Sequence, residues 1–245
     1  MAIFGISDLH LSLSAPFLAG QATQSYKPMD VFGIHWQNHV ERLYQNWQKM
    51  VQPGDSVLMP GDLSWGLHLA ECRYDFDFLS QLNGTIYLSK GNHDYWWDTK
   101  KKAEAALPAN CVVLQHQSVC IENVILAATR GWLCPGSKEF TVQDQKIYQR
   151  ELIRLEMALQ EGAQLRNERS QAAEFWVMLH YRPVNDNFEP SGFIDLLQKY
   201  QVNRCFYGHL HGNPANHILT GVHWGIQFQL LSSDHLQFCP MQLSK

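Results

Sequence analysis

The 245-residue sequence predicts an α/β protein with a mixed β-sheet system. Apolar segments typical of strands alternate along the chain with segments of helical period, and this alternation is characteristic of α/β sheet proteins. Only Glu122-Asn123 separates two of the strand-like segments, which indicates a tight antiparallel hairpin and hence sheets that are not purely parallel. Hydrophobic residues make up 45% of the chain, enough for a sizeable core. Because we find no internal repeat, low-complexity tract or linker, we expect residues 1–245 to form a single domain.

Strands are expected where short apolar runs are bounded by turn-forming residues. The predicted strands are residues 2–7, 55–60, 85–89, 111–114, 117–121, 124–128, 174–180, 203–207 and 222–230.

Helices are expected where apolar residues recur at steps of three and four. This period runs from Trp36 to Val51, and again from Phe76 to Leu82, where Asn83-Gly84 ends the second helix. A long polar helix with an apolar stripe is predicted over residues 144–168, and a short one over residues 193–200.

Composition narrows the function before any motif is considered. The formal charge of −4 gives no electrostatic footprint for nucleic acid. The N-terminus lacks the basic flank and long apolar run of a signal peptide, and no run is long enough for a membrane helix. The six cysteines form no CxxC pair, and Cys111, Cys120 and Cys205 lie in apolar strand-like runs where buried free thiols are expected. We therefore expect a cytoplasmic protein with reduced cysteines.

Polar residues follow five of the predicted strands at their carboxyl ends, where open α/β sheets bind ligands. These residues are Asp8 and His10, then Asp62, then Asn92, His93 and Asp94, then His180, and finally His209 and His211. Each group alone has a simpler explanation: a D-x-H triplet is common, Asp62 could be a helix N-cap, and His180 could be a hydrogen-bonded core histidine. Their repetition at successive strand ends favours a metal site.

The donor types indicate which metals and which reaction to expect. Imidazole, carboxylate and amide donors without cysteine suit Mn, Fe or Zn ions. Without His93 and Asp94, seven of these nine residues remain as ligands, which exceeds the needs of one ion. Two ions sharing a carboxylate are therefore expected, as in enzymes that hydrolyse phosphoesters by attack of a hydroxide bridging two metals. His93 lies next to a predicted ligand and is suited to donate a proton to the leaving oxygen.

In type and in order, these motifs closely resemble those of the calcineurin-like metallophosphoesterase family. The D-x-H, G-D, G-N-H-D, lone His and G-H-x-H motifs run from Asp8 to His211. The resemblance implies a four-layer α/β/β/α sandwich of two mixed sheets flanked by helices. It also implies one metal on Asp8, His10 and His211, a second on Asn92, His180 and His209, with Asp62 bridging. His93 would be the general acid, and Asp94 would orient His93 or the turn.

Departures from known subfamilies narrow the substrate. Protein Ser/Thr phosphatases carry G-N-H-E and an arginine soon after the bridging aspartate, whereas this chain has Asp94 and no arginine in residues 61–66. The lipid A pathway pyrophosphatases share the opening around Asp8 but typically have arginine where His93 stands. Nuclease members usually add a domain and basic surfaces.

Beyond the metal ligands, a few residues could shape the choice of substrate. Arg130 could hold a phosphate in a bidentate contact, although an ion-pairing arginine at the surface is an equal alternative. Arg182 is a second candidate. A long loop over residues 11–30 leaves the first ligand pair, and four tryptophans lie near the motifs: Trp65, Trp96, Trp97 and Trp132. We expect a small phosphoester as substrate, with a nuclease, or a non-enzymatic scaffold on the same fold, as alternatives.

Overall fold

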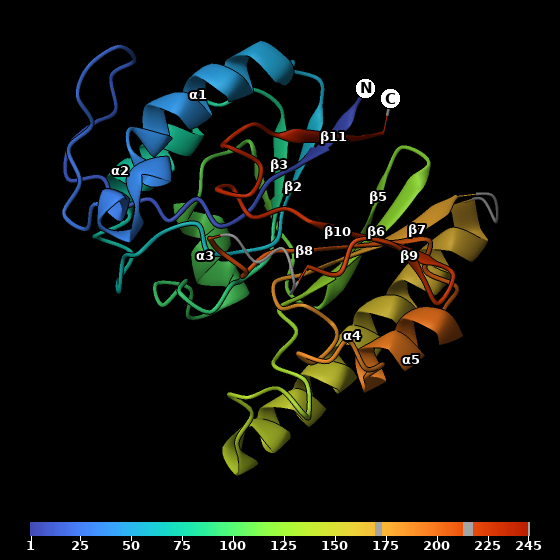
Figure 1. The fold of residues 1–245 in the computed structure, drawn as a ribbon. Helices are drawn as coiled ribbons and strands as arrows, with labels where there is room; N and C mark the ends of the chain where they lie inside the picture. The colour runs from blue at the N-terminus through green and yellow to red at the C-terminus, as the bar shows by residue number, and fades with distance from the viewer. Residues whose placement is uncertain (170–172, 213–217, 245) are drawn as a thin grey trace. The chain divides into compact units, whose positions relative to one another are not determined.

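The computed structural model describes residues 1–169, 173–212 and 218–244. The chain divides into two compact units (Figure 1). The first unit comprises Met1–Val113 and Leu231–Lys245, and the second comprises Leu114–Leu230. Each unit contains one mixed sheet, flanking helices and its own hydrophobic core. The predicted α/β class with two mixed sheets is confirmed, while the single domain and the stacking of the layers stay predictions.

The sheet of the first unit has the order β11-β1-β2-β3-β4. Its strands are β1 (Ile3–Gly5), β2 (Ser56–Met59), β3 (Thr85–Leu88), β4 (Cys111–Val113) and β11 (Met241–Ser244). Neighbours from β1 to β4 pair in parallel, so their carboxyl ends lie at one edge, and β11 pairs antiparallel with β1. The sequence predicted β1 to β4 within two residues but missed β11.

The helices of the first unit are α1 (His39–Met50), α2 (Arg73–Leu79) and α3 (Lys100–Ala106), with 3-10 turns η1 (Met29–Phe32) and η2 (Ile34–Trp36). Val40, Leu43 and Trp47 form the predicted apolar stripe of α1 and are buried. The predicted start of this helix at Trp36 is wrong, because Asn38 adopts a left-handed conformation and separates Trp36 from the helix. Figure 1 shows α1 and α2 on the same side of the first sheet.

The sheet of the second unit has the order β5-β6-β7-β8-β10-β9. Its strands are β5 (Gln117–Ile121), β6 (Val124–Thr129), β7 (Glu174–Leu179), β8 (Arg204–Tyr207), β9 (Gly221–His223) and β10 (Ile226–Leu230). The predicted hairpin is confirmed, because β5 and β6 pair antiparallel across Glu122-Asn123. The single strand predicted at 222–230 is wrong: the chain reverses at Trp224-Gly225, both with positive φ, and forms β9 and β10.

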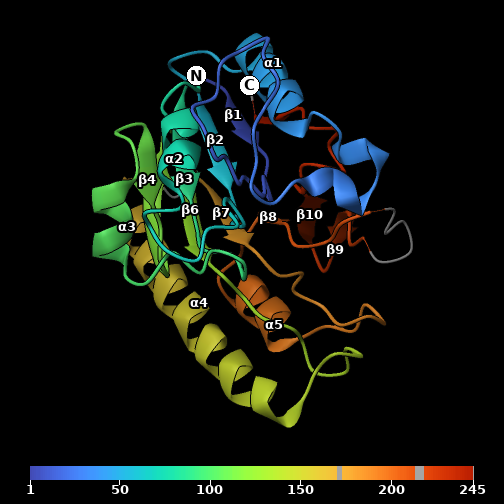
Figure 2. The ribbon, with the colours of Figure 1, turned by 90° about the vertical axis from the view of Figure 1, so that its left-hand side faces the viewer.

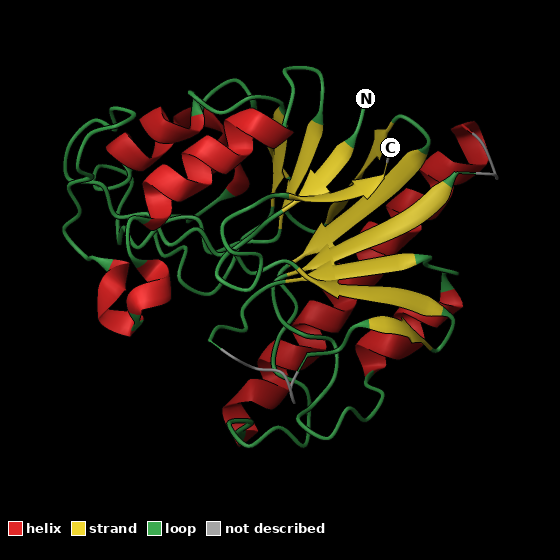
Figure 3. Ribbon diagram, turned by 45° about the horizontal axis from the view of Figure 1, so that its top comes forward, coloured by secondary structure: helices red, strands yellow, loops and turns green. Residues whose placement is uncertain are grey.

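Two helices cover a face of the second sheet (Figures 2 and 3). The long helix α4 (Val142–Arg169) packs on β5 and β6 and against α5 (Gly192–Lys199). All six cysteines are free; Cys205 is buried as expected, but Cys111 and Cys120 are only half-buried. Within the described part of the chain, no helix combines the length and apolar character that crossing a membrane requires.

Candidate metal centre

The segments that follow β1 and β2 run side by side in the first unit. Backbone hydrogen bonds join Asp8 N to Gly61 O at 3.0 Å and His10 N to Asp62 O at 3.1 Å. Because β1 and β2 are parallel neighbours, these loops leave the sheet at the same edge. The arrangement brings Asp8 and His10 beside Asp62, as expected from their positions at strand ends.

These three residues share an uncommon backbone conformation. The φ angles of Asp8, His10 and Asp62 are 58°, 48° and 53°. Non-glycine residues in the left-handed region are uncommon, and such strain concentrates at functional sites, where the surrounding structure holds it in place. In this chain, the backbone hydrogen bonds between the loops after β1 and β2 hold these left-handed conformations in place.

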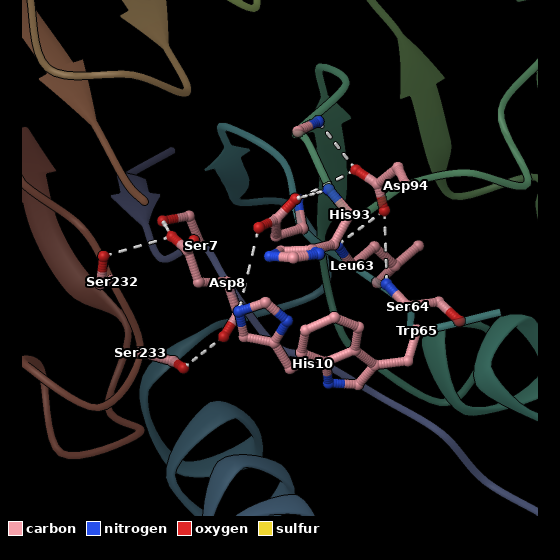
Figure 4. Close-up of polar contacts among 12 residues, drawn as sticks. Ser7, Asp8, His10, Leu63, Ser64, Trp65, His93, Asp94, Ser232 and Ser233 are labelled. Atoms are coloured by element: carbon pink, nitrogen blue, oxygen red, sulfur yellow. Dashed lines mark hydrogen bonds and ion pairs between the residues drawn. The ribbon is translucent and has the colours of Figure 1, made fainter. Parts of the chain in front are cut away.

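Asp8, His10 and Asp62 form a compact, buried donor set, of which Figure 4 labels Asp8 and His10. Carboxylate oxygens of Asp8 and Asp62 lie within 4.8 Å of each other, and a His10 nitrogen also lies within 4.8 Å of an Asp8 oxygen. His10 Nε2 is 3.9 Å from Asp62 Oδ2. The exposed fraction of each side chain is 2% or less. Two carboxylates this close and this buried repel each other unless a cation or proton lies nearby, so the donor set fits a divalent metal ion.

Gly91 gives the Asp62 carboxylate the space it occupies. A Cβ atom at Gly91 would lie 2.1 Å from Asp62 Oδ1 and 2.4 Å from Asp62 N, distances that real Cβ atoms do not show. The backbone N–H of His93 donates a hydrogen bond of 2.7 Å to Asp62 Oδ1. The turn after β3 therefore sets the orientation of Asp62.

Asp94 is fully buried and fixes two loops at once. Its carboxylate oxygens accept hydrogen bonds of 2.8 to 3.3 Å from the backbone N–H groups of Asp62, Leu63, Ser64 and Gly91 and from Trp96 Nε1. Figure 4 shows the Asp94 side chain turned toward the Leu63-Ser64 backbone. This geometry supports the role of orienting the turn.

Three serines hold Asp8. Ser7 Oγ donates a short hydrogen bond to Asp8 Oδ2, Ser232 Oγ donates to the same oxygen at 3.2 Å, and Ser233 Oγ donates to Asp8 O at 2.7 Å. Ser232 and Ser233 were missed in the sequence analysis. The signal that could have identified them is the one used for the other site residues, since they are polar residues that follow β10 after a single leucine.

His93 lies half-buried among aromatic rings. Its ring centroid is 4.3 Å from that of Trp65 and 5.6 Å from that of His10. Trp65 stacks on His10 with centroids 4.7 Å apart and planes 22° apart. Asn92 is half-buried on the same turn after β3. The structure thus brings the predicted site residues of the first unit together in the loops that follow β1, β2 and β3.

The remaining predicted ligands lie in the second unit. His180 is fully buried directly after β7, and its carbonyl accepts a 3.1 Å hydrogen bond from Gly208 N. This bond aligns the loop after β8, and the His180 and His209 rings lie 5.1 Å apart. His209 also has a positive φ, 71°. His211 is exposed two residues further on.

Arg130 and Arg182 have partners within the second unit. Arg130 Nη2 lies 3.4 Å from the buried Glu151 Oε1, and its guanidinium lies 4.4 Å from the Trp132 ring centroid. These contacts favour the ion-pairing alternative, and substrate binding by Arg130 stays a prediction. Arg182 donates to Asp186 Oδ1 at 2.9 Å.

Comparison with known proteins supports the family that the motifs resemble. A family model described as calcineurin-like phosphoesterase matches residues 1–213. No curated protein matches the chain significantly.

Two solved structures share the fold at low sequence identity. A protein of unknown function from Aquifex aeolicus, AQ665, has 12% identity and a TM-score of 0.53; the match covers 98% of this chain and 95% of that one. GAP50, described as the anchor in the inner membrane complex of Plasmodium, has 8% identity and a TM-score of 0.50, over 96% of this chain and 72% of that one. Likeness at this identity concerns the fold alone.

Proposed function

The chain belongs to the calcineurin-like phosphoesterase family, and we propose that it hydrolyses a phosphomonoester or phosphodiester bond with the help of divalent metal ions. The observation that carries the proposal is the buried donor set of Asp8, His10 and Asp62. Bound divalent ions activate water near neutral pH and neutralise phosphoryl oxygens. An enzyme of this kind needs the clustered carboxylates that the first unit provides.

The proposed ligands of two ions follow from family membership. The first set is Asp8, His10 and His211, the second is Asn92, His180 and His209, and Asp62 is shared. Nitrogen and oxygen donors of this kind suit Mn, Fe or Zn.

His93 is the proposed proton donor to the leaving oxygen. Its backbone N–H is tied to Asp62, while its ring lies beside Trp65 and close to His10. A titratable ring fixed at this position can hold a proton near the scissile bond. Asp94 supports the step indirectly, since it holds the loop that carries Asp62.

A scaffold without activity is the rival from another class. GAP50 is described as an anchor, so the fold alone does not decide between enzyme and scaffold. The retention of all seven predicted ligands favours the enzyme.

We further infer a cytoplasmic protein that acts on a small phosphoester rather than on nucleic acid. The support is six free cysteines and a formal charge of −4. Fractionation of cells that express the tagged chain, and DNA binding measured at several salt concentrations, would check both points.

The function is tested by hydrolysis of p-nitrophenyl phosphate and bis(p-nitrophenyl) phosphate. We expect chelation to remove turnover and added Mn²⁺, Fe²⁺ or Zn²⁺ to restore it. The preferred substrate would separate a monoesterase from a diesterase. Turnover that survives chelation, or its absence with every ion and both substrates, would contradict the proposal.

A further inference from the structure

The first unit contains a pocket that the metal chemistry does not use. Its volume is about 600 Å³. Its wall includes Tyr26, Lys27, Trp65, Leu67, Glu71 and Tyr74. These residues come from the long loop of residues 11–30, from the segment leading into α2 and, for Tyr74, from the first turn of α2.

The loop of residues 11–30 folds back on itself and forms part of the wall of this pocket. Ser12 Oγ donates to Lys27 O at 2.7 Å, and Tyr26 N donates to Ser12 O at 2.9 Å. Leu13 and Ser25 also form an isolated antiparallel bridge. These contacts bring Tyr26 and Lys27 next to the stretch that carries Trp65.

Trp65 belongs both to the pocket and to the candidate metal centre. Its indole ring stacks on His10 and contacts His93, and Lys27 Nζ lies 3.5 Å from the ring centroid (Figure 4 for the first two contacts). A group that touches Trp65 in the pocket would therefore lie close to the predicted proton donor.

The charges of the wall indicate what the pocket accepts. Lys27 is exposed, and no ion-pair partner is found for its ammonium among the described residues. Glu71 contributes a negative charge to the same wall, and its Oε2 accepts a 2.8 Å hydrogen bond from Leu67 N. The Tyr26 hydroxyl is part of the wall and can donate a hydrogen bond, and burial and nearby acidic groups raise its pKa further above neutral pH. Lys27 thus supplies positive charge beside aromatic surface.

We propose that this pocket binds the leaving group of the substrate, and that this group combines an aromatic ring with a negatively charged substituent. The inference rests on the proposed phosphoester hydrolysis. Tyr26, Tyr74 and Trp65 provide aromatic surface for the ring, and Lys27 provides the charge that pairs with the substituent.

Kinetics with three phosphomonoesters test the proposal: 4-carboxyphenyl phosphate, phenyl phosphate and butyl phosphate. Lys27→Met should raise KM for 4-carboxyphenyl phosphate about two- to fivefold and leave KM for phenyl phosphate unchanged, as expected for an exposed ion pair. Glu71→Gln, a matched change in the same wall, should lower KM for the carboxylated substrate. Tyr74→Leu should raise KM for both aryl substrates but not for butyl phosphate. Each KM is expressed as the ratio of variant to wild type, which removes the effect of the different leaving-group basicities of the three substrates.

Equilibrium binding separates this inference from the proposed function. Calorimetry would compare 4-carboxybenzylphosphonate with benzylphosphonate on the metal-loaded wild type and on Lys27→Met. One outcome is that the enzyme turns over its substrates while Lys27→Met affects the carboxylated and the uncarboxylated compound equally, both among the aryl phosphates and among the phosphonates. That outcome would overturn the pocket assignment and leave the proposed hydrolysis standing. Selective loss of binding of the carboxylated phosphonate, without turnover of any ester, would support the pocket and refute the proposed function.

Discussion

Asp94 fixes two loops of the candidate metal centre through hydrogen bonds. Its carboxylate accepts hydrogen bonds from both the Asp62 loop and the turn at Gly91. We predict that Asp94→Asn destabilises the fold by about 1.5–3 kcal/mol, because an amide NH₂ would face N–H donors. Metal affinity should fall as well. Thermal unfolding and metal titration measure the two effects.

The control for this change is Asp77→Asn, which alters an exposed aspartate of α2. It should leave both quantities unchanged. An Asp94→Asn variant with wild-type stability and metal affinity would show that these hydrogen bonds do not position Asp62.

The proposed role of His93 leads to a leaving-group effect. A p-nitrophenolate leaves without a proton, whereas an alkoxide needs one. His93→Gln should lower kcat for butyl phosphate by about 10²–10⁴ and affect p-nitrophenyl phosphate far less. His68→Gln changes an exposed histidine of the same unit and serves as the control. Equal losses on both substrates would count against His93 as the acid.

At the residue scale, the sequence indicated the candidate ligands of the first unit but not the residues that hold them. Asp8, His10 and Asp62 were found because polar residues at strand ends stand out from apolar runs. Ser232 and Ser233 support Asp8 from more than 220 positions away, through a chain reversal that no local pattern encodes. The only indication of these serines in the sequence is that they follow a strand.

The turn after β3 requires glycine at position 91 for a steric reason. In Gly91→Ala the new Cβ would overlap Asp62 N and Oδ1, and a backbone atom cannot move aside cheaply. We predict a loss of about 1–3 kcal/mol in stability and weaker metal binding, measured by unfolding and titration. Gly54→Ala is the matched control, because nothing lies within 4 Å of its Cβ position. A variant at position 91 that binds metal as well as wild type would refute this account of the turn.

Helix α2 carries a buried carboxyl that links two site loops. Asp75 accepts hydrogen bonds from Leu13 N and Ser64 Oγ, and burial raises its pKa to about 7. Its folded-state pKa lies above the ordinary value of 3.8, so folding favours the protonated form. This contribution to stability is present below about pH 4 and is lost as pH rises through 7.

Asp75→Asn should remove that pH dependence. We expect the free energy of unfolding of the wild type to fall relative to the variant between about pH 4 and pH 7, because only the wild type loses a proton there. Denaturant unfolding at several pH values gives the difference. Parallel curves for the two proteins would contradict a raised pKa at Asp75.

At the element scale, strong periodicity was predictable and short or irregular segments were not. The stripe of α1 and the hairpin at Glu122-Asn123 appear in the sequence as clear patterns. Helix α3 has one buried residue, Ala103, and therefore almost no apolar period. The turn at Trp224-Gly225 places a tryptophan at positive φ, which residue preferences do not favour.

For the whole molecule, alternation of strands and helices was enough to predict an α/β chain, and the hairpin indicated a mixed sheet system, whereas the two separate sheets were implied only by the family resemblance. The division into two units was not predictable, because Leu231–Lys245 joins the N-terminal unit across the sequence. Strand β11 belongs to this returning segment, so its pairing with β1 depends on contacts that are distant in sequence.

The central claim is that Asp62 belongs to a two-metal centre that drives phosphoester hydrolysis. Metal content by mass spectrometry, together with turnover of bis(p-nitrophenyl) phosphate and p-nitrophenyl phosphate, tests it most directly in the wild type and in Asp62→Ala. We predict about two metal ions per chain and measurable turnover in the wild type, and loss of two-metal occupancy and of turnover in the variant. Near-wild-type metal content and activity in Asp62→Ala would contradict the account.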